Sequence, residues 1–209
     1  MRVGTLLLCA SCLPALASAQ AQQAATLVLE FEEGFDGLGR EGPIPATVEG
    51  QPKLVPGRFG QALLSGPGTG YLHFPTRGVV LPIRGTVEAW VCPVDWAGTE
   101  EKFHVFFDVR GEGALYLYKY YQQTNLLMLS CPAIRGPYYS ADLPLNWEPG
   151  QWHHIAGTWS SRGVMSYVDG RPLSTDPVPA ALPVSLGATF RIGDNPWHLP
   201  RRSSSTAGT

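Results

Sequence analysis

The apolar residues of this chain recur in short stretches with a two-residue period, separated by glycine, proline, asparagine and aspartate. The clearest stretch is TVEAWVC at residues 86–92, where Val87 and Ala89 share one face and Trp90 and Cys92 share the other. Because successive side chains of a strand point to opposite faces, both faces of this strand carry bulk. The pattern therefore predicts a central strand that is covered on both sides.

Similar alternation predicts strands along most of the chain, while no stretch has the period of an amphipathic helix. Asp169-Gly170 is the strongest hairpin signal, because a type I′ turn needs positive φ at both central residues. Residues 32–58 are rich in glycine and proline and are predicted as a long loop. The other predicted strands are at residues 26–31, 59–64, 71–74, 104–109, 114–120, 125–131, 152–159, 164–168 and 189–192.

The first residues differ from the rest and have the layout of a secretory signal. Met1-Arg2 is positively charged, residues 6–16 are apolar, and small residues around Ala19 and Ala21 offer a cleavage site. The apolar stretch is shorter than the roughly 20 residues that a membrane span requires. We therefore predict that residues 1–21 are a signal peptide, and that the protein has no membrane span and is secreted to the extracellular space or the periplasm.

Net charge and composition narrow the class of protein further. The formal net charge is −2, with 24 glycines and 19 prolines among 209 residues. Arg201-Arg202 is the only doublet of basic residues, which argues against nucleic acid as a partner. The length that remains after the leader suits one all-β domain.

Four segments in this order resemble a known family: GRFGQALLSGPGTGYL, GTVEAWVCP, GQWHHIAGTWSSRGVMSYVDGRPL and FRIGDN. Over about residues 31–195 the chain resembles the LamG-like jellyroll domains of the concanavalin A-like lectin and glucanase superfamily. The resemblance implies an all-β fold, a two-sheet antiparallel jellyroll β-sandwich, which we place at residues 25–195. The polar residues 196–209 are predicted to be a disordered tail.

One departure from the family concerns the end of the domain. Members continue after the IG motif into an acidic turn and a last strand, and nothing similar follows Asn195. Either the chain is a fragment of a longer protein, or its sandwich lacks the terminal strand. Because the first and last strands are neighbours in the resembled fold, residues 26–31 are expected to have a poorly covered edge.

The family resemblance implies ligands at the concave face or at the rim loops. Tyr116, Tyr118 and Tyr120 share one face of a predicted strand, and Tyr138 and Tyr139 follow in a nearby loop. Aromatic rings stack on sugar rings, so these tyrosines are the candidate ligand-binding residues. The alternative is that they simply pack in the sheet.

The expected function is carbohydrate binding; the alternative is a protein-interaction or adhesion domain of a larger extracellular protein. The partner is accordingly a glycan or an extracellular protein.

The acidic residues bear on catalysis and on metal binding. The glucanases of the superfamily carry Glu-x-Asp-x-x-Glu on one strand, and the nearest cluster here, Glu32-Glu33-x-x-Asp36, has the wrong spacing. A non-catalytic module is therefore expected, with glycoside hydrolysis the less favoured alternative. No cofactor is expected except calcium, which relatives often hold in loops. Glu33, Asp36 and Asp194 could contribute to such a site.

Cys92 and Cys131 are the two cysteines that remain after the expected leader, and each is followed by proline. In an oxidising compartment an even pair suggests a bridge. A disulfide between them is predicted, with two buried free thiols as the alternative.

Overall fold

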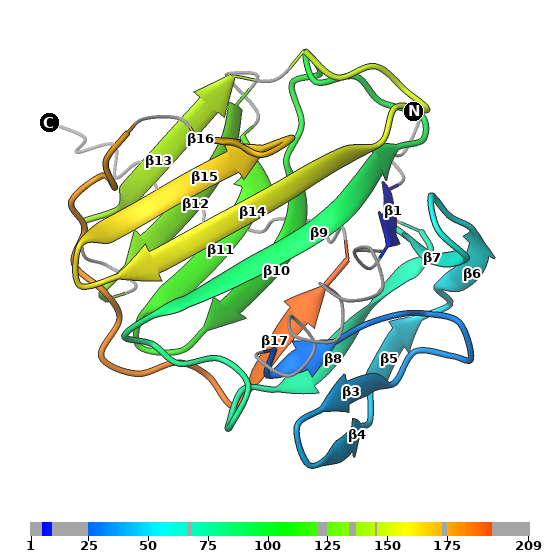
Figure 1. Cartoon of the computed structure of the whole chain (residues 1–209), viewed down its shortest axis with the longest axis horizontal. Coiled ribbons are helices and arrows are strands. Elements are labelled where there is room, and N and C mark those ends of the chain that lie inside the picture. Colours follow the sequence, from blue (N-terminus) through cyan, green and yellow to red (C-terminus); the bar gives the residue numbers. More distant parts are fainter. Residues whose placement is uncertain are drawn as a thin grey trace, which may run out of the picture.

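The computed structural model describes residues 6–9, 25–66, 68–120, 125–133, 137–144, 146–172 and 175–193. Two seven-stranded antiparallel sheets pack face to face, which confirms the predicted β-sandwich (Figure 1). In the described part of the chain, no helix has the length and apolar character needed to cross a membrane.

We call the two layers the front sheet and the back sheet, as they lie in Figure 1. The front sheet has the order β16 (Arg171–Pro172), β15 (Gly163–Val168), β14 (His153–Ser160), β9 (Gly85–Pro93), β1 (Leu6–Cys9), β7 (Gln61–Ser65) and β6 (Lys53–Pro56). The back sheet has the order β13 (Tyr139–Pro144), β12 (Asn125–Cys131), β11 (Ala114–Lys119), β10 (His104–Arg110), β17 (Thr189–Ile192), β8 (Gly70–Pro75) and β5 (Thr47–Gly50). A small third sheet joins β2 (Leu27–Val28), β3 (Gly37–Gly39) and β4 (Gly42–Ile44).

The core lies between the two large sheets, where strand alternation directs the apolar side chains. Phe107 of the back sheet stacks on Trp159 of the front sheet with ring centroids 6.3 Å apart. Phe107 also contacts Phe190 on the neighbouring strand, at 5.7 Å. The Trp159 indole donates a hydrogen bond of 2.8 Å to the carbonyl of Leu81, which satisfies its polar group inside the core.

Most of the strands expected from alternation are present within one or two residues of their expected bounds. The hairpin at Asp169-Gly170 is confirmed, because both residues have positive φ, 51° and 76°, between β15 and β16. The loop expected at residues 32–58 is wrong, since this segment holds β3 to β6. These strands have only three or four residues and contain glycine and proline, so they carry little alternation.

The prediction of a six-residue sandwich strand at residues 26–31 is also wrong. Only Leu27–Val28 forms a strand there, and it belongs to the small third sheet rather than to the sandwich. Phe31 follows in an irregular segment with φ of 62°. It is 3% exposed, and its side chain packs in the main core.

Strand β1 comes from residues expected to belong to the leader. Leu6–Cys9 lies in the middle of the front sheet and pairs with β7 on one side and β9 on the other. The front sheet of the uncleaved chain is therefore continuous. The expected tail at residues 196–209 lies outside the described residues.

The expected disulfide is not formed: Cys92 and Cys131 are both free and buried. Cys92 lies on β9 of the front sheet, on the same face as Trp90, and Cys131 lies on β12 of the back sheet, in a cluster with Leu129 on the outer side. Packed sheets lie roughly 10 Å apart, so two thiols on opposite outer faces are beyond the reach of a bridge. The bridge would need both cysteines in one sheet or on the inner faces, and the sequence alone did not decide this.

Candidate functional site on the outer face of the back sheet

A row of polar side chains crosses four neighbouring strands of the back sheet. The register aligns His73 on β8 with Arg191 on β17, Arg191 with Asp108 on β10, and Asp108 with Tyr116 on β11. The residues next to them in sequence, such as Phe190 and Phe107, belong to the core. Because strand side chains alternate, the row lies on the outer face of the sheet.

Asp108 is the centre of this row and is held by two arginines. Its side chain is 1% exposed, and its Oδ1 accepts a hydrogen bond of 2.6 Å from Nε of Arg191. Its Oδ2 accepts from Nε of Arg110 at 2.9 Å and also from Nη2 of Arg191. Burial alone would lower the pKa of Arg191, but its hydrogen bond and charge interaction with Asp108 outweigh this and raise it. The hydrogen bonds with Asp108 therefore hold both guanidinium groups in place.

A second carboxylate lies beside the row. Glu49 on β5 accepts a hydrogen bond of 2.5 Å from the hydroxyl of Tyr71, and its other oxygen lies 3.0 Å from Nε2 of His73. The hydrogen bond from Tyr71, followed by that with His73, lowers the pKa of Glu49 below its usual value. Burial, followed by the hydrogen bond with Glu49, raises the pKa of Tyr71. Arg191 lies over the Tyr71 ring at 5.6 Å, which joins the two groups.

These side chains surround a surface pocket of about 210 Å³. It is lined by His73, Asp108, Arg110, Thr189 and Arg191. The lining residues carry one carboxylate and two guanidinium groups. Glu49, which hydrogen-bonds with His73, brings a second carboxylate next to them, so the formal charges of the four groups cancel. Closely spaced donors and acceptors without net charge suit a neutral ligand that carries several hydroxyl groups.

The expected tyrosine ladder is present but is mostly covered. Tyr116, Tyr118 and Tyr120 do share one face, in edge-to-face contacts with ring centroids 6.2 Å and 6.4 Å apart. However, Tyr116 and Tyr118 are only 8% and 3% exposed, and Phe103 packs on Tyr118 at 6.0 Å. Burial raises the pKa of Tyr116 to about 12. The ladder thus supports the sheet, and its two buried members offer no open platform to a sugar.

The remaining tyrosine candidates differ from the ladder. Tyr138 is 56% exposed, and Tyr139 is partly exposed at the start of β13. Tyr138 directly precedes β13, which is separated from the tyrosine strand β11 by β12 alone. The Tyr116 ring reaches the pocket indirectly, because the Arg110 guanidinium lies over it at 5.4 Å.

The structure describes two of the three expected calcium ligands. Glu33 and Asp36 lie in a bend before β3, and Oδ1 of Asp36 accepts a hydrogen bond of 2.9 Å from the backbone of Ala46. Among the described residues, no group of three or more potential ligands could hold a metal ion. Asp194 lies outside the described residues, so the calcium site stays a prediction.

The pocket residues were missed in the sequence, although a signal for them exists. Arg191 and His73 each lie next to phenylalanine or leucine in a short strand, in TFRI and YLHF, and Asp108 follows two phenylalanines in HVFFDVR. A charged or polar residue beside phenylalanine indicates a strand with one buried face and one face toward solvent. What the sequence did not indicate is that the three strands are neighbours.

Comparisons with known proteins agree with this architecture. The chain is similar to domain 4 of AbnA, an extracellular arabinanase from Geobacillus stearothermophilus solved with arabinotriose, with a TM-score of 0.58 and 20% identity, covering 75% of this chain and 76% of that one. It is also similar to a botulinum neurotoxin type C structure, whose title links cell entry to two ganglioside molecules. That match has a TM-score of 0.67 and 13% identity and covers 90% of this chain, but only 46% of the toxin chain. No curated protein matches the chain in sequence.

The sandwich and its outer polar face define a lectin-like β-sandwich protein. A sequence profile of the concanavalin A-like lectin/glucanases superfamily matches residues 66–208. The chain belongs to this superfamily, as the four sequence segments suggested.

Proposed function

We propose that this protein is an exported, non-catalytic binding module that takes a neutral carbohydrate in the pocket on the back sheet. The observation that carries the proposal is the charge-balanced group formed by Asp108, Arg110 and Arg191 together with the neighbouring Glu49. Two guanidinium groups bind one buried carboxylate there, at 2.6 Å and 2.9 Å, beside His73 and Thr189. Such a group is held rigid before any ligand arrives, which lowers the entropy cost of binding.

Two features favour a sugar over other ligands. The pocket opens on a sheet surface and has hydrogen-bonding groups of both kinds, as a polyhydroxylated ring requires. The Tyr71 hydroxyl donates to Glu49 beside the pocket, and its oxygen can still accept a hydrogen bond from a ligand hydroxyl. The lectin-like fold is compatible with this use, although the similar arabinanase and toxin domains are alike in fold alone.

The carboxylates of this face argue against glycoside hydrolysis. A glycosidase needs a general acid whose pKa is raised, together with a second carboxylate at a suitable distance. The pKa of Glu49 is lowered instead, by its hydrogen bonds with Tyr71 and His73. Both oxygens of Asp108 accept hydrogen bonds from guanidinium groups. At this face, the arrangement of the two carboxylates favours ligand binding over acid catalysis.

The test is a glycan array followed by titration calorimetry with the best neutral oligosaccharide. His73→Ala combined with Thr189→Ala removes two hydrogen-bonding groups and leaves the Asp108 clamp intact. Each lost hydrogen bond is worth roughly 0.5–1.5 kcal/mol, so the double variant should bind about tenfold more weakly. Thr86→Ala is the matched control, because Thr86 is exposed on β9 of the opposite sheet. If the unaltered chain retains no glycan, or if both variants bind equally well, the proposal fails.

Export is a separate part of the proposal and has its own test. The amino-terminal layout predicts a mature terminus near Gln20 or Gln22. Mass spectrometry of protein recovered from the medium or the periplasm should find that terminus. Secreted protein that still begins at Met1 would contradict it.

A further inference from the structure

Strand β1 lies between two parts of the front sheet and pairs with both. Leu8 of β1 pairs with Leu63 of β7 on one side and with Val91 of β9 on the other. The order of the sheet is β14-β9-β1-β7-β6, so β1 is the strand that links its two parts. Without β1, the edges of β7 and β9 would present unpaired backbone groups to solvent.

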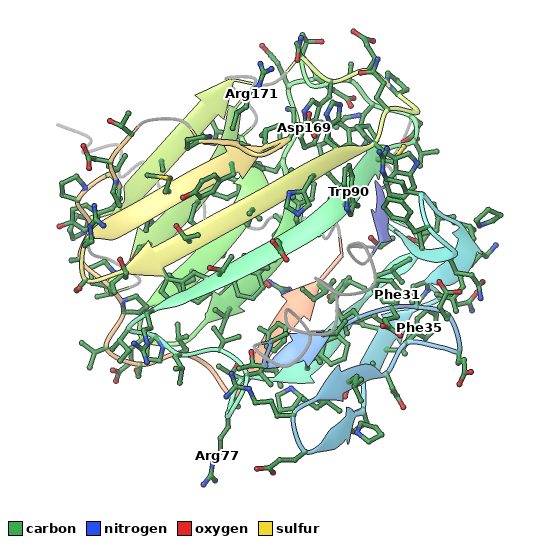
Figure 2. All side chains as sticks on the ribbon, in the orientation of Figure 1. Phe31, Phe35, Arg77, Trp90, Asp169 and Arg171 are labelled. Carbon is green, nitrogen blue, oxygen red and sulfur yellow. The ribbon has the colours of Figure 1, made fainter. Side chains whose placement is uncertain are left out.

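The two edges are also linked by side chains. Phe59, in the turn between β6 and β7, makes an edge-to-face contact with Trp90 of β9 at 5.9 Å. The Arg58 guanidinium lies over the Trp90 ring at 4.1 Å. Figure 2 shows Trp90 on β9 beside β1. Because Trp90 pairs with Cys9, this clasp spans the groove at one end of β1.

The walls of the groove determine what it can accept. The residues that pair with β1 carry no charge: Leu63, Leu64, Ser65, Trp90, Val91, Cys92 and Pro93. Leu63 and Val91 are 0% exposed and belong to the main core. A charged segment would therefore be disfavoured, whereas an apolar strand can add backbone hydrogen bonds on both sides.

We propose that the groove between β7 and β9 is a strand-acceptor site that binds an extended, uncharged apolar segment of another chain once Leu6–Cys9 has left it. The expected signal peptide contains Leu6–Cys9, so export would remove the strand that completes the sheet. The clasp of Arg58, Phe59 and Trp90 keeps the two edges together at that stage. The partner contributes at least four residues that run antiparallel to both edges, as Leu6–Cys9 does. This site is in the front sheet and does not depend on the sugar pocket.

The experiment starts from the full chain. A protease recognition sequence is introduced within residues 11–24, and the folded protein is cut there and incubated with a large excess of a labelled peptide. The peptide has the sequence of residues 4–11, with serine in place of Cys9. The cut protein should bind the peptide saturably and release its own amino-terminal fragment, while the uncut protein should bind at least tenfold less. A peptide with aspartate at the position of Leu8 is the matched control and should lose at least tenfold in affinity.

A variant of the uncut chain tests the same site without proteolysis. Leu8→Asp places a carboxylate opposite Leu63 and Val91, so it should expel β1 and allow the labelled peptide to bind. If the cut protein unfolds, restoration of its circular dichroism by the peptide supports the proposal, and failure to restore it overturns it. The proposal is also overturned if the cut protein stays folded without taking the peptide, or if the aspartate peptide binds equally well.

Discussion

Replacing Asp108 with alanine should destabilise the fold through the two arginines that it leaves behind. In the structure its carboxylate accepts hydrogen bonds from Arg191 and Arg110 while it is 1% exposed. Asp108→Ala removes the acceptor and leaves two partly buried guanidinium groups facing each other. Truncating one partner of a buried ion pair is costly because the remaining charge has been taken out of water.

The size of the effect follows from how much water reaches the arginines. A fully buried pair costs roughly 3–5 kcal/mol when one partner is removed. The side chains of Arg191 and Arg110 are 22% and 34% exposed, so solvent recovers part of their hydration. We therefore expect Asp108→Ala to lower the free energy of unfolding by about 2–3 kcal/mol. Combined with Arg191→Met, it should show a coupling of about 1–2 kcal/mol.

Urea denaturation measures this loss, provided that the slope with denaturant is unchanged. Asp176→Ala is the matched control, because Asp176 pairs with Arg162 at 3.7 Å and both side chains are more than 70% exposed. An exposed pair is worth roughly 0–1 kcal/mol, so the control should be nearly neutral. If Asp108→Ala costs no more than Asp176→Ala, the buried clamp does not hold the back sheet together. The reasoning from burial would then be refuted.

Three further results are expected. Lys119 is fully buried and donates to the backbone carbonyls of three residues, two of them at 3.0 Å and 3.1 Å, so Lys119→Met should destabilise the fold by about 3 kcal/mol in urea. Tyr116, with its pKa raised by burial to about 12 from 10.0, favours the folded state below pH 10; its contribution should be lost between pH 10 and 12, and Tyr116→Phe should reduce that loss in an alkaline titration. Alkylation of the unfolded, unreduced protein should label Cys92 and Cys131 completely, as peptide mass spectrometry would show.

The sandwich could be predicted largely because strand alternation is local. TVEAWVC has bulk on both faces, and the structure places it as β9 in the middle of the front sheet. Asp169-Gly170 indicated its turn through two adjacent residues whose φ values are both positive. The short strands in residues 32–58 could not be found in this way, because three or four residues with glycine and proline show no period.

The polar face of the back sheet could not be predicted, because it depends on which strands become neighbours. Glu49, His73, Asp108 and Arg191 come from four strands that are scattered along the chain and meet only through the register of the back sheet. The tyrosines were easier to notice because they repeat within one strand. Tyr118 is covered in part by Phe103, which contacts it from outside that strand. A repeated residue type thus indicated a shared face correctly and accessibility incorrectly.

The amino-terminal segment also shows that composition alone does not determine the structure that a segment forms. Leu6–Cys9 is apolar enough for the core of a signal peptide, and the same property suits a central strand whose neighbours include the buried Leu63 and Val91. Composition alone cannot separate the two uses, because both require an uncharged segment that leaves water. The two uses differ in backbone hydrogen bonding, because a central strand must pair with a neighbour on both of its edges. Because β7 and β9 pair with Leu6–Cys9 on both sides, this apolar segment is what makes the front sheet continuous in the structure.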